Sequence, residues 1–235
     1  MTQLENRNAL IVVAKRPAPG NTKTRLSPPL SPEQASALYE CFLADTLDQI
    51  RQVEGVERVI AYLPADARDY FHRLAPDFQL IQQEGPDLGA RLDHALTSYL
   101  SRGYAHAVIM DSDSPTLPAA HLSQAFAALS DGAQVVLGPC EDGGYYLIGC
   151  NRPVPRLLRE VRMSTPTVAA DTIALASEEG LHLTQLPTWY DVDNGASLLR
   201  LAREIDVLDL GTAVYTRRFL DRGPIRLLLR EAGSS

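Results

Sequence analysis

The chain has 235 residues, of which 45% are apolar and 22% are charged, so its composition is that of a folded globular protein rather than a disordered or fibrous one. Its 22 basic and 29 acidic residues give a formal net charge of −7, and the isoelectric point is near 5.2. This balance argues against a protein that coats nucleic acid, which needs a broad basic surface. Small anionic ligands remain possible, because they need only a local positive pocket.

Neither a membrane span nor a disulfide framework is expected. The first apolar run, residues 9–14, is too short for a signal-peptide core or a membrane span, and no later run approaches about 18 apolar residues. Cys41, Cys140 and Cys150 lie far apart, without a C-x-x-C pair or a nearby histidine. We therefore expect a cytoplasmic protein with reduced thiols and without a structural zinc ion.

Apolar patterning predicts strands that alternate with helices along the chain. The first strand, 9–14, is rich in β-branched residues and is typical of a strand buried on both faces of a parallel sheet. The first helix begins after Ser31, which forms a capping-box pattern with Gln34, and it extends through Ile50. The later strands are expected at 56–63, 78–81, 105–110, 133–137, 145–148 and 181–186. The later helices are expected at 66–75, 88–100, 118–129, 166–176 and 194–205.

This alternation predicts an α/β fold in which helices cover both faces of a mostly parallel sheet. No linker or repeat interrupts it, so residues 1–205 are expected to form one domain. Residues 206–235 are expected to be a C-terminal extension that packs on this domain or trails from it. In such a sheet, ligands bind beyond the carboxyl ends of the strands, which directs attention to the polar motifs found there.

The loop after the first strand is strongly basic. The chain has 20 arginines but only two lysines, and both lysines fall in this loop. Four cations without an intervening acid lie there: Lys15, Arg16, Lys23 and Arg25. The loop is either a pocket for an anion or a solvated tether, and its prolines and Gly20 favour a pocket. It is not a Walker loop, because Pro17 and Thr22 stand where that motif needs glycine.

Two acidic motifs follow other strands. Asp111 and Asp113 come directly after 105–110, and Asp191 and Asp193 precede the last expected helix. Together with the basic loop they would supply carboxylates for a divalent cation and cations for phosphates, as a nucleotide–metal complex requires. Each motif also has a structural alternative, since the first can be a turn and the second can cap the helix that begins near residue 194.

Three further segments could contact a ligand. Segment 141–144 ends in two glycines, which indicate either backbone pressed against a ligand or a plain hairpin turn. Segments 88–91 and 164–167 open helices, where backbone N–H groups can meet an anion or can simply be capped.

Taken in order, these motifs resemble a bacterial glycosyltransferase family of the nucleotide-diphospho-sugar transferase superfamily, of GT-A type, with members associated with arsenosugar-type biosynthesis. They also resemble small nucleotidyltransferases, including the guanylyltransferase of deazaflavin-cofactor synthesis. The segments that carry the resemblance are 14–26, 111–115, 138–149, 163–168 and 190–193. Two features depart from the family pattern: Ser114 stands where members commonly carry cysteine, and the chain after about 206 lies outside the resemblance.

The resemblance implies a single GT-A-like (Rossmann-like) three-layer sandwich that binds a nucleotide and Mg²⁺ or Mn²⁺. The expected metal ligands are Asp111, Asp113 and Asp193. The expected nucleotide and phosphate contacts are Lys15, Arg16, Gly20, Lys23, Arg25, Leu88, Gly89, Arg91 and Ser112. The expected acceptor contacts are Gly143, Gly144, Tyr145, Ser164, Thr165 and Thr167. The expected catalytic residues are Asp113, Lys23, Glu141 and Asp142.

The leading hypothesis is glycosyl transfer from a nucleotide sugar to a small-molecule acceptor. The metal would act as a Lewis acid on the departing diphosphate, and Glu141 or Asp142 would deprotonate the acceptor. The alternative is transfer of a nucleoside monophosphate from a triphosphate to a phosphorylated acceptor with release of pyrophosphate, which the three cations Lys15, Lys23 and Arg25 would suit. A haloacid-dehalogenase-type phosphatase and a non-enzymatic nucleotide sensor fit the motifs less well.

Overall fold

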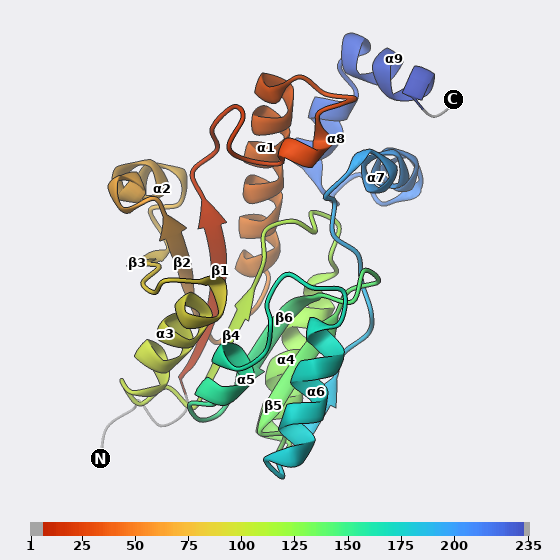
Figure 1. Ribbon diagram of the computed structural model, residues 1–235. Helices are drawn as coiled ribbons and strands as arrows, with labels where there is room; N and C mark the ends of the chain where they lie inside the picture. The colour runs from red at the N-terminus through yellow and green to blue at the C-terminus, as the bar shows by residue number, and fades with distance from the viewer. Residues whose placement is uncertain (1–6, 233–235) are drawn as a thin grey trace.

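The seven strands of the computed structural model, which describes residues 7–232, form one sheet in the order β3-β2-β1-β4-β6-β5-β7 (Figure 1). The strands are β1 Asn8–Lys15, β2 Val56–Leu63, β3 Gln79–Gln82, β4 His106–Met110, β5 Val135–Pro139, β6 Tyr145–Cys150 and β7 Leu183–Gln185. All neighbouring strands run parallel except β6, which is antiparallel to both β4 and β5. The predicted mostly parallel α/β sandwich is confirmed.

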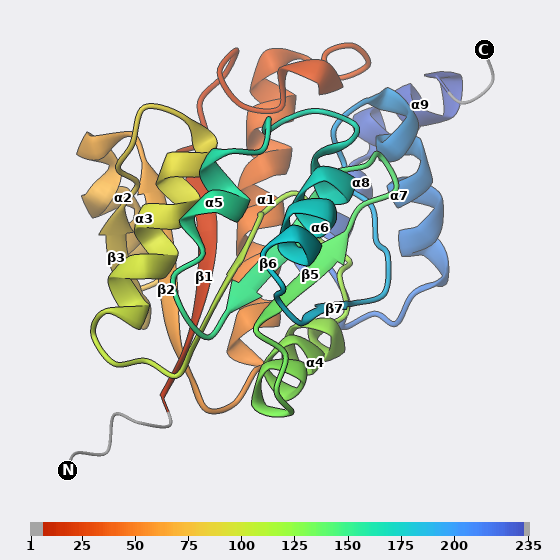
Figure 2. The same cartoon turned by 60° about the horizontal axis from the view of Figure 1, so that its bottom comes forward.

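Helices cover both faces of this sheet (Figures 1 and 2). The core on one side of the sheet includes residues of α1 Pro32–Arg51, α2 Arg68–Leu74, α4 Ala119–Ser130, α7 Gly195–Val207 and α8 Val214–Leu220. The other face packs against α3 Leu88–Leu100, α5 Pro155–Arg159 and α6 Val168–Glu178. Strand β1 serves both cores, because Leu10 and Val12 point to the first face while Ala9 and Ile11 point to the second. This alternation explains why its sequence is apolar throughout.

The predicted start of α1 is confirmed in detail. The Ser31 hydroxyl accepts a hydrogen bond from the Gln34 backbone N–H, and the Gln34 side chain accepts one from the Ser31 N–H. The helix expected at 166–176 begins two residues later, at Val168. Helix α5 was not expected, since its five residues are too few to show a helical period.

The antiparallel direction of β6 brings its first residues to the edge of the sheet where β4 and β5 end. The Asp111 N–H, directly after β4, donates to the Tyr146 carbonyl at 3.0 Å. The loop that joins β5 to β6 therefore opens beside the motif that begins at Asp111.

The chain after residue 206 forms α8 and α9 Gly223–Ala232, and α8 packs against α1. The Asp45 carboxylate of α1 accepts hydrogen bonds from the backbone N–H groups of Tyr215 and Thr216, at 3.0 and 2.8 Å. These bonds satisfy free N–H groups at the start of α8. Burial nevertheless raises the pKa of Asp45. The division of the chain near residue 205 stays a prediction.

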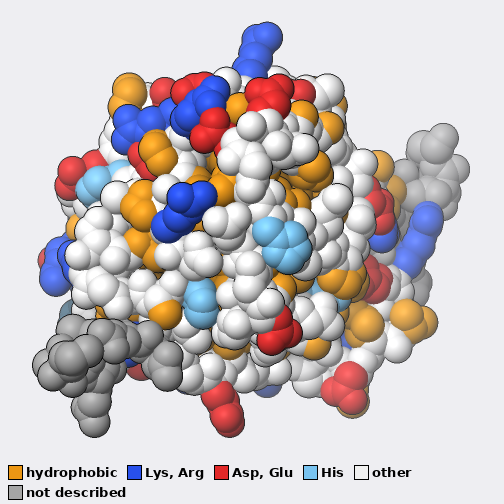
Figure 3. All heavy atoms as spheres, turned by 90° about the horizontal axis from the view of Figure 1, so that it is seen from below, with side chains coloured by type: hydrophobic (Ala, Val, Ile, Leu, Met, Phe, Trp, Pro, Cys, Tyr) orange, Lys and Arg blue, Asp and Glu red, His pale blue; other side chains and the backbone are white. Residues whose placement is uncertain are grey.

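On the face that Figure 3 shows, acidic and basic side chains are interspersed rather than gathered into one broad basic area. Within residues 7–232, none of the helices combines the length and the apolar character that crossing a bilayer requires.

Candidate active site

Two adjoining pockets lie at the edge of the sheet where β1 and β4 end. The larger, which we call the acidic pocket, has a volume of about 420 Å³. Five carboxylates line it: Asp111, Asp113, Asp142, Asp191 and Asp193. The smaller, which we call the basic pocket, has a volume of about 310 Å³, and Lys15, Lys23 and Arg25 line it. Arg25, Asp113 and Asp193 line both pockets, so the two form one continuous site.

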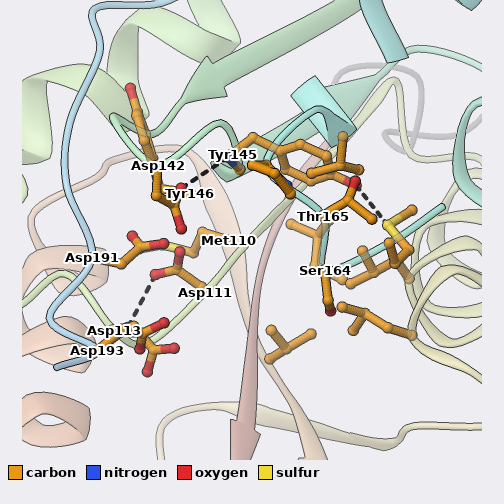
Figure 4. Close-up of a pocket in the computed structure, with 18 of the residues that line it drawn as sticks. Met110, Asp111, Asp113, Asp142, Tyr145, Tyr146, Ser164, Thr165, Asp191 and Asp193 are labelled. Atoms are coloured by element: carbon orange, nitrogen blue, oxygen red, sulfur yellow. Dashed lines mark hydrogen bonds between the residues drawn. The ribbon is translucent and has the colours of Figure 1, made fainter. Parts of the chain in front are cut away.

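Figure 4 shows the carboxylates on one side of the acidic pocket, across from Ser164 and Thr165. Asp111 and Asp191 form a close group with the thiol of Cys140, in which the three candidate ligand atoms lie within 4.8 Å of one another. Burial and then the charge of Asp113 raise the pKa of Asp191 to about 6. Burial also raises the pKa of Asp111, followed by repulsion from Asp191. Without a cation beside them, Asp111 and Asp191 therefore resist carrying a negative charge each.

Lys23 occupies the boundary between the pockets. Its Nζ lies 2.8 Å from Asp113 Oδ1, 2.8 Å from Asp193 Oδ1 and 2.9 Å from the Val192 carbonyl oxygen. An ammonium group has three N–H donors, so these partners satisfy all of them. The side chain is only 6% exposed. Burial opposes its charge, but Asp113 and Asp193 outweigh that effect and raise the pKa of Lys23.

Arg25 presents an accessible positive charge to both pockets. Its side chain is 75% exposed, and its guanidinium lies 3.0 Å from Asp193 Oδ2. Burial raises the pKa of Asp193, but Lys23 and then Arg25 lower it to below its usual value overall. Asp193 is therefore already compensated by two cations of the chain, in contrast to Asp191.

Hydrogen bonds connect the basic loop and the two acidic motifs. The Tyr39 hydroxyl accepts from the Lys15 N–H at 3.2 Å and lies 2.9 Å from Ser112 Oγ, which ties the basic loop to the first acidic motif. The Val192 N–H donates to the Asp113 carbonyl at 3.0 Å, which ties the two acidic motifs together. Asn194 caps α7, so the alternative that the second acidic motif caps this helix is wrong.

The two acidic side chains of segment 141–144 lie in different surroundings. Asp142 lines the acidic pocket, and its Oδ1 accepts from the Gly144 N–H at 2.8 Å. Glu141 faces Arg200 of α7 instead, with two hydrogen bonds of 2.5 and 3.0 Å, and these bonds lower its pKa. The structure thus does not bring Glu141 to the pocket, in contrast to the role expected for it.

Several other expected contact residues line the acidic pocket: Leu88, Gly144, Tyr145, Ser164 and Thr165. The remaining expected residues lie outside the linings of both pockets: Arg16, Gly20, Gly89, Arg91, Ser112, Gly143 and Thr167.

Three of these residues have structural partners elsewhere. Arg16 pairs with Asp66, and Thr167 donates to Asp171. The Arg91 side chain donates to the carbonyl of Gly85.

Two glycines are needed for close backbone approach. A Cβ at Gly89 would lie 2.0 Å from the Leu158 carbonyl oxygen. A Cβ at Gly143, whose φ is +88°, would lie 1.8 Å from the Pro166 carbonyl oxygen. Gly143 therefore packs against the segment before α6 rather than facing the pocket.

Two members of the site were not among the expected ligands. Asp191 alternates with Asp193 in an extended segment, so two-residue spacing could have placed both on one side. Cys140 carried no spacing signal. An apolar half of the acidic pocket was also not expected, and it includes Val13, Leu88, Leu92, Ile109, Met163 and Val168.

Comparison with known proteins identifies the family of this chain. Residues 46–165, about half of the chain, match a family described as "uncharacterized protein conserved in bacteria" (DUF2064). The chain belongs to this family. A crystal structure from Desulfovibrio desulfuricans G20, titled as a "putative nucleotide-diphospho-sugar transferase", is 30% identical with a TM-score of 0.88, over 95% of this chain and 97% of that one. A search of curated proteins gave no match.

More distant structures share the fold. Glucosyl-3-phosphoglycerate synthase from Mycobacterium tuberculosis, solved with Mn²⁺, UDP and glucosyl-3-phosphoglycerate, is 13% identical with a TM-score of 0.52, over 88% of this chain and 82% of that one. A CMP-2-keto-3-deoxy-manno-octonic acid synthetase solved with CTP is 13% identical with a TM-score of 0.54, over 86% and 100%. These two structures show the fold alone, whereas the Desulfovibrio structure confirms the predicted resemblance and the transferase class.

Proposed function

We propose that this protein is a metal-dependent glycosyltransferase that moves a sugar from a nucleotide-sugar donor to a small-molecule acceptor. The observation that carries the proposal is the continuity of the two pockets, which share Arg25, Asp113 and Asp193. A diphosphate lying across this boundary would meet cations on one side and carboxylates on the other. Five carboxylates repel a phosphate unless a divalent cation lies between them.

The donor set fits such a cation. Asp111 and Asp191 would hold Mg²⁺ or Mn²⁺, because their carboxylates are close together and neither is paired with a cation of the described chain, whereas Asp113 and Asp193 are paired with Lys23. When bound, the metal supplies charge stabilisation for the departing diphosphate. Lys23 then acts by holding Asp113 and Asp193 in place rather than by contacting phosphate.

The chain's own residues account for the other roles. Lys15 and Arg25 would bind the phosphates from the basic pocket, and the apolar half of the acidic pocket would exclude water from organic groups. Asp142 would take the proton of the acceptor hydroxyl as the sugar is transferred, since it is the acid of segment 141–144 that faces the pocket.

The number of available cations favours a diphosphate donor over a triphosphate. Lys23 is fully occupied by internal partners and Arg16 lies outside both pockets, which leaves Lys15 and the exposed Arg25 for phosphate, although Arg25 also pairs with Asp193. Two cations and one metal ion balance the diphosphate of a nucleotide sugar better than a triphosphate, which carries more negative charge.

Nucleotidyl transfer to a phosphorylated acceptor is the second candidate. The continuity of the basic pocket with the acids also suits a triphosphate, and the fold includes a CTP-bound synthetase among its relatives. Among the described residues that line the acidic pocket, however, Arg25 is the only cation, so an acceptor phosphate would lack a partner of its own.

Product analysis distinguishes the two. The purified protein is incubated with Mn²⁺ and a panel of nucleotide sugars and nucleoside triphosphates, with candidate acceptors. Release of a nucleoside diphosphate from a nucleotide sugar supports the proposal, and release of pyrophosphate from a triphosphate overturns it in favour of the second candidate. Asp191→Asn serves as the control that should abolish either activity without unfolding the chain.

A further inference from the structure

Cys140 lies in the group of candidate metal ligands and is held there firmly. Its Sγ is 3.2 Å from Asp191 Oδ1, and the residue is only 5% exposed. The Cys140 N–H donates to the Gly144 carbonyl at 2.9 Å, and the Cys140 carbonyl accepts from the Gly143 N–H at 3.1 Å. An isolated bridge also pairs Cys140 with Trp189, just before the second acidic motif. The thiol therefore has a fixed position beside both aspartates.

This position gives the site a mixed donor set. Carboxylate oxygens alone suit Mg²⁺ and Mn²⁺, whereas a thiolate favours softer cations such as Zn²⁺, Co²⁺ and Cd²⁺. We propose that Cys140 is a metal ligand together with Asp111 and Asp191, and that it makes the site prefer a thiophilic divalent cation to Mg²⁺. The inference deepens the proposed function, since it concerns the metal of the same site.

Coordination changes no oxidation state. The sulfur–metal bond forms as the S–H bond of Cys140 breaks, and the proton passes to solvent. The competing explanation is that the thiol only donates a hydrogen bond to Asp191 and so orients its carboxylate. Serine would retain that hydrogen bond but would not supply a thiolate, so Cys140→Ser separates the two explanations.

The test uses Co²⁺ alone with the full chain, without a nucleotide. A thiolate bound to Co²⁺ gives a ligand-to-metal charge-transfer absorption in the near ultraviolet. We expect this band in the wild type, in Cys41→Ser and in Cys150→Ser, and not in Cys140→Ser. Cys150 is a matched control, because it is also free and fully buried but lies in the opposite core layer.

Affinity gives a second readout. Co²⁺ and Cd²⁺ should bind Cys140→Ser about tenfold or more weakly than the wild type, while Mg²⁺ affinity changes little. If Cys140→Ser does not fold, ¹¹³Cd NMR of the wild type still decides, since sulfur ligation moves the resonance far from that of an all-oxygen site.

A wild type without the cobalt band, a band that persists in Cys140→Ser, or an all-oxygen cadmium resonance overturns the inference. Mn²⁺-dependent transfer that persists in that case leaves the proposed function standing. A cobalt band in a protein that releases no nucleoside diphosphate from any nucleotide sugar contradicts the proposed function instead.

Discussion

Lys23 and Asp193 are 170 positions apart in the sequence, yet their side chains form a 2.8 Å ion pair where the two pockets meet. Lys23 joins Asp113 in the same way, so one ammonium group holds both acidic motifs. It thereby offsets the repulsion between two carboxylates that lie close together. Removing it should affect stability and metal binding together.

Lys23→Met should lower the free energy of unfolding by about 1–3 kcal/mol, because it leaves the partly buried Asp113 without a counter-charge and Asp193 with Arg25 alone. Urea unfolding measures this effect. Arg16→Met is the matched control, because its pair with Asp66 is exposed and should contribute less than about 1 kcal/mol. Mn²⁺ should restore part of the stability of Lys23→Met, and equal losses in the two variants would contradict this role.

The two acids of segment 141–144 should differ in catalysis. Asp142→Asn should lower the rate of sugar transfer by about 10²-fold or more, with donor binding retained, because the acceptor loses its general base. Glu141→Gln should leave the rate near that of the wild type, since Glu141 pairs with Arg200 outside the pocket. Steady-state kinetics with the donor found in the product assay measures both. A larger loss in Glu141→Gln than in Asp142→Asn would reverse the assignment.

The raised pKa of Asp191 predicts a pH-dependent stability in metal-free protein. Burial and the charge of Asp113 raise the pKa from 3.8 to about 6, so the folded state binds a proton more readily than the unfolded chain does. The resulting stabilisation is complete below about pH 4 and is lost as the pH rises through about 6.

Relative to Asp191→Asn, the wild type should therefore lose about 1–3 kcal/mol between pH 4 and pH 7. Denaturant unfolding in the presence of a chelator measures the difference at each pH. Mn²⁺ affinity should rise over the same range. A difference between the two proteins that stays constant with pH would show that Asp191 titrates normally.

Gly143→Ala should be strongly destabilising, by about 3 kcal/mol or more, because the new Cβ would collide with the Pro166 carbonyl oxygen and the residue has a positive φ. Gly20→Ala separates the two causes. Gly20 also has a positive φ, +72°, but an added Cβ there meets nothing within 4 Å, so the loss should be about 1–2 kcal/mol. Similar losses at both positions would mean that the contact with Pro166 adjusts without cost.

Much of the fold could be predicted because its signals are local. The period of the apolar residues indicates most helices and strands within a short window. The capping residues Ser31 and Gln34 mark the start of α1 in the same local way. The direction of β6 depends on tertiary pairing, although the short link between β5 and β6 was a usable signal, since a parallel crossover needs a dozen or more residues. Helices α8 and α9 lay beyond the resemblance, and α8 packs against α1, which is far away in sequence.

The general position of the site could also be predicted, because the carboxyl ends of parallel strands meet at one edge. The partners of individual side chains could not. No local pattern indicates that the Lys23 ammonium group would form ion pairs with two aspartates. Nor does any local pattern indicate that Glu141 would face α7 while Asp142 lines the pocket. Such directions depend on turn geometry and on neighbours brought close only by folding.

The place of β1 between β2 and β4 limits where the chain can be truncated. The segment shared with the family, 46–165, excludes β1, although β1 is hydrogen-bonded to β2 on one side and to β4 on the other. A recombinant fragment cut at those limits would leave two half-sheets with unpaired inner margins, which are prone to self-association. Expression libraries and truncation series should therefore keep β1, residues 8–15, whose removal would divide the sheet through its middle.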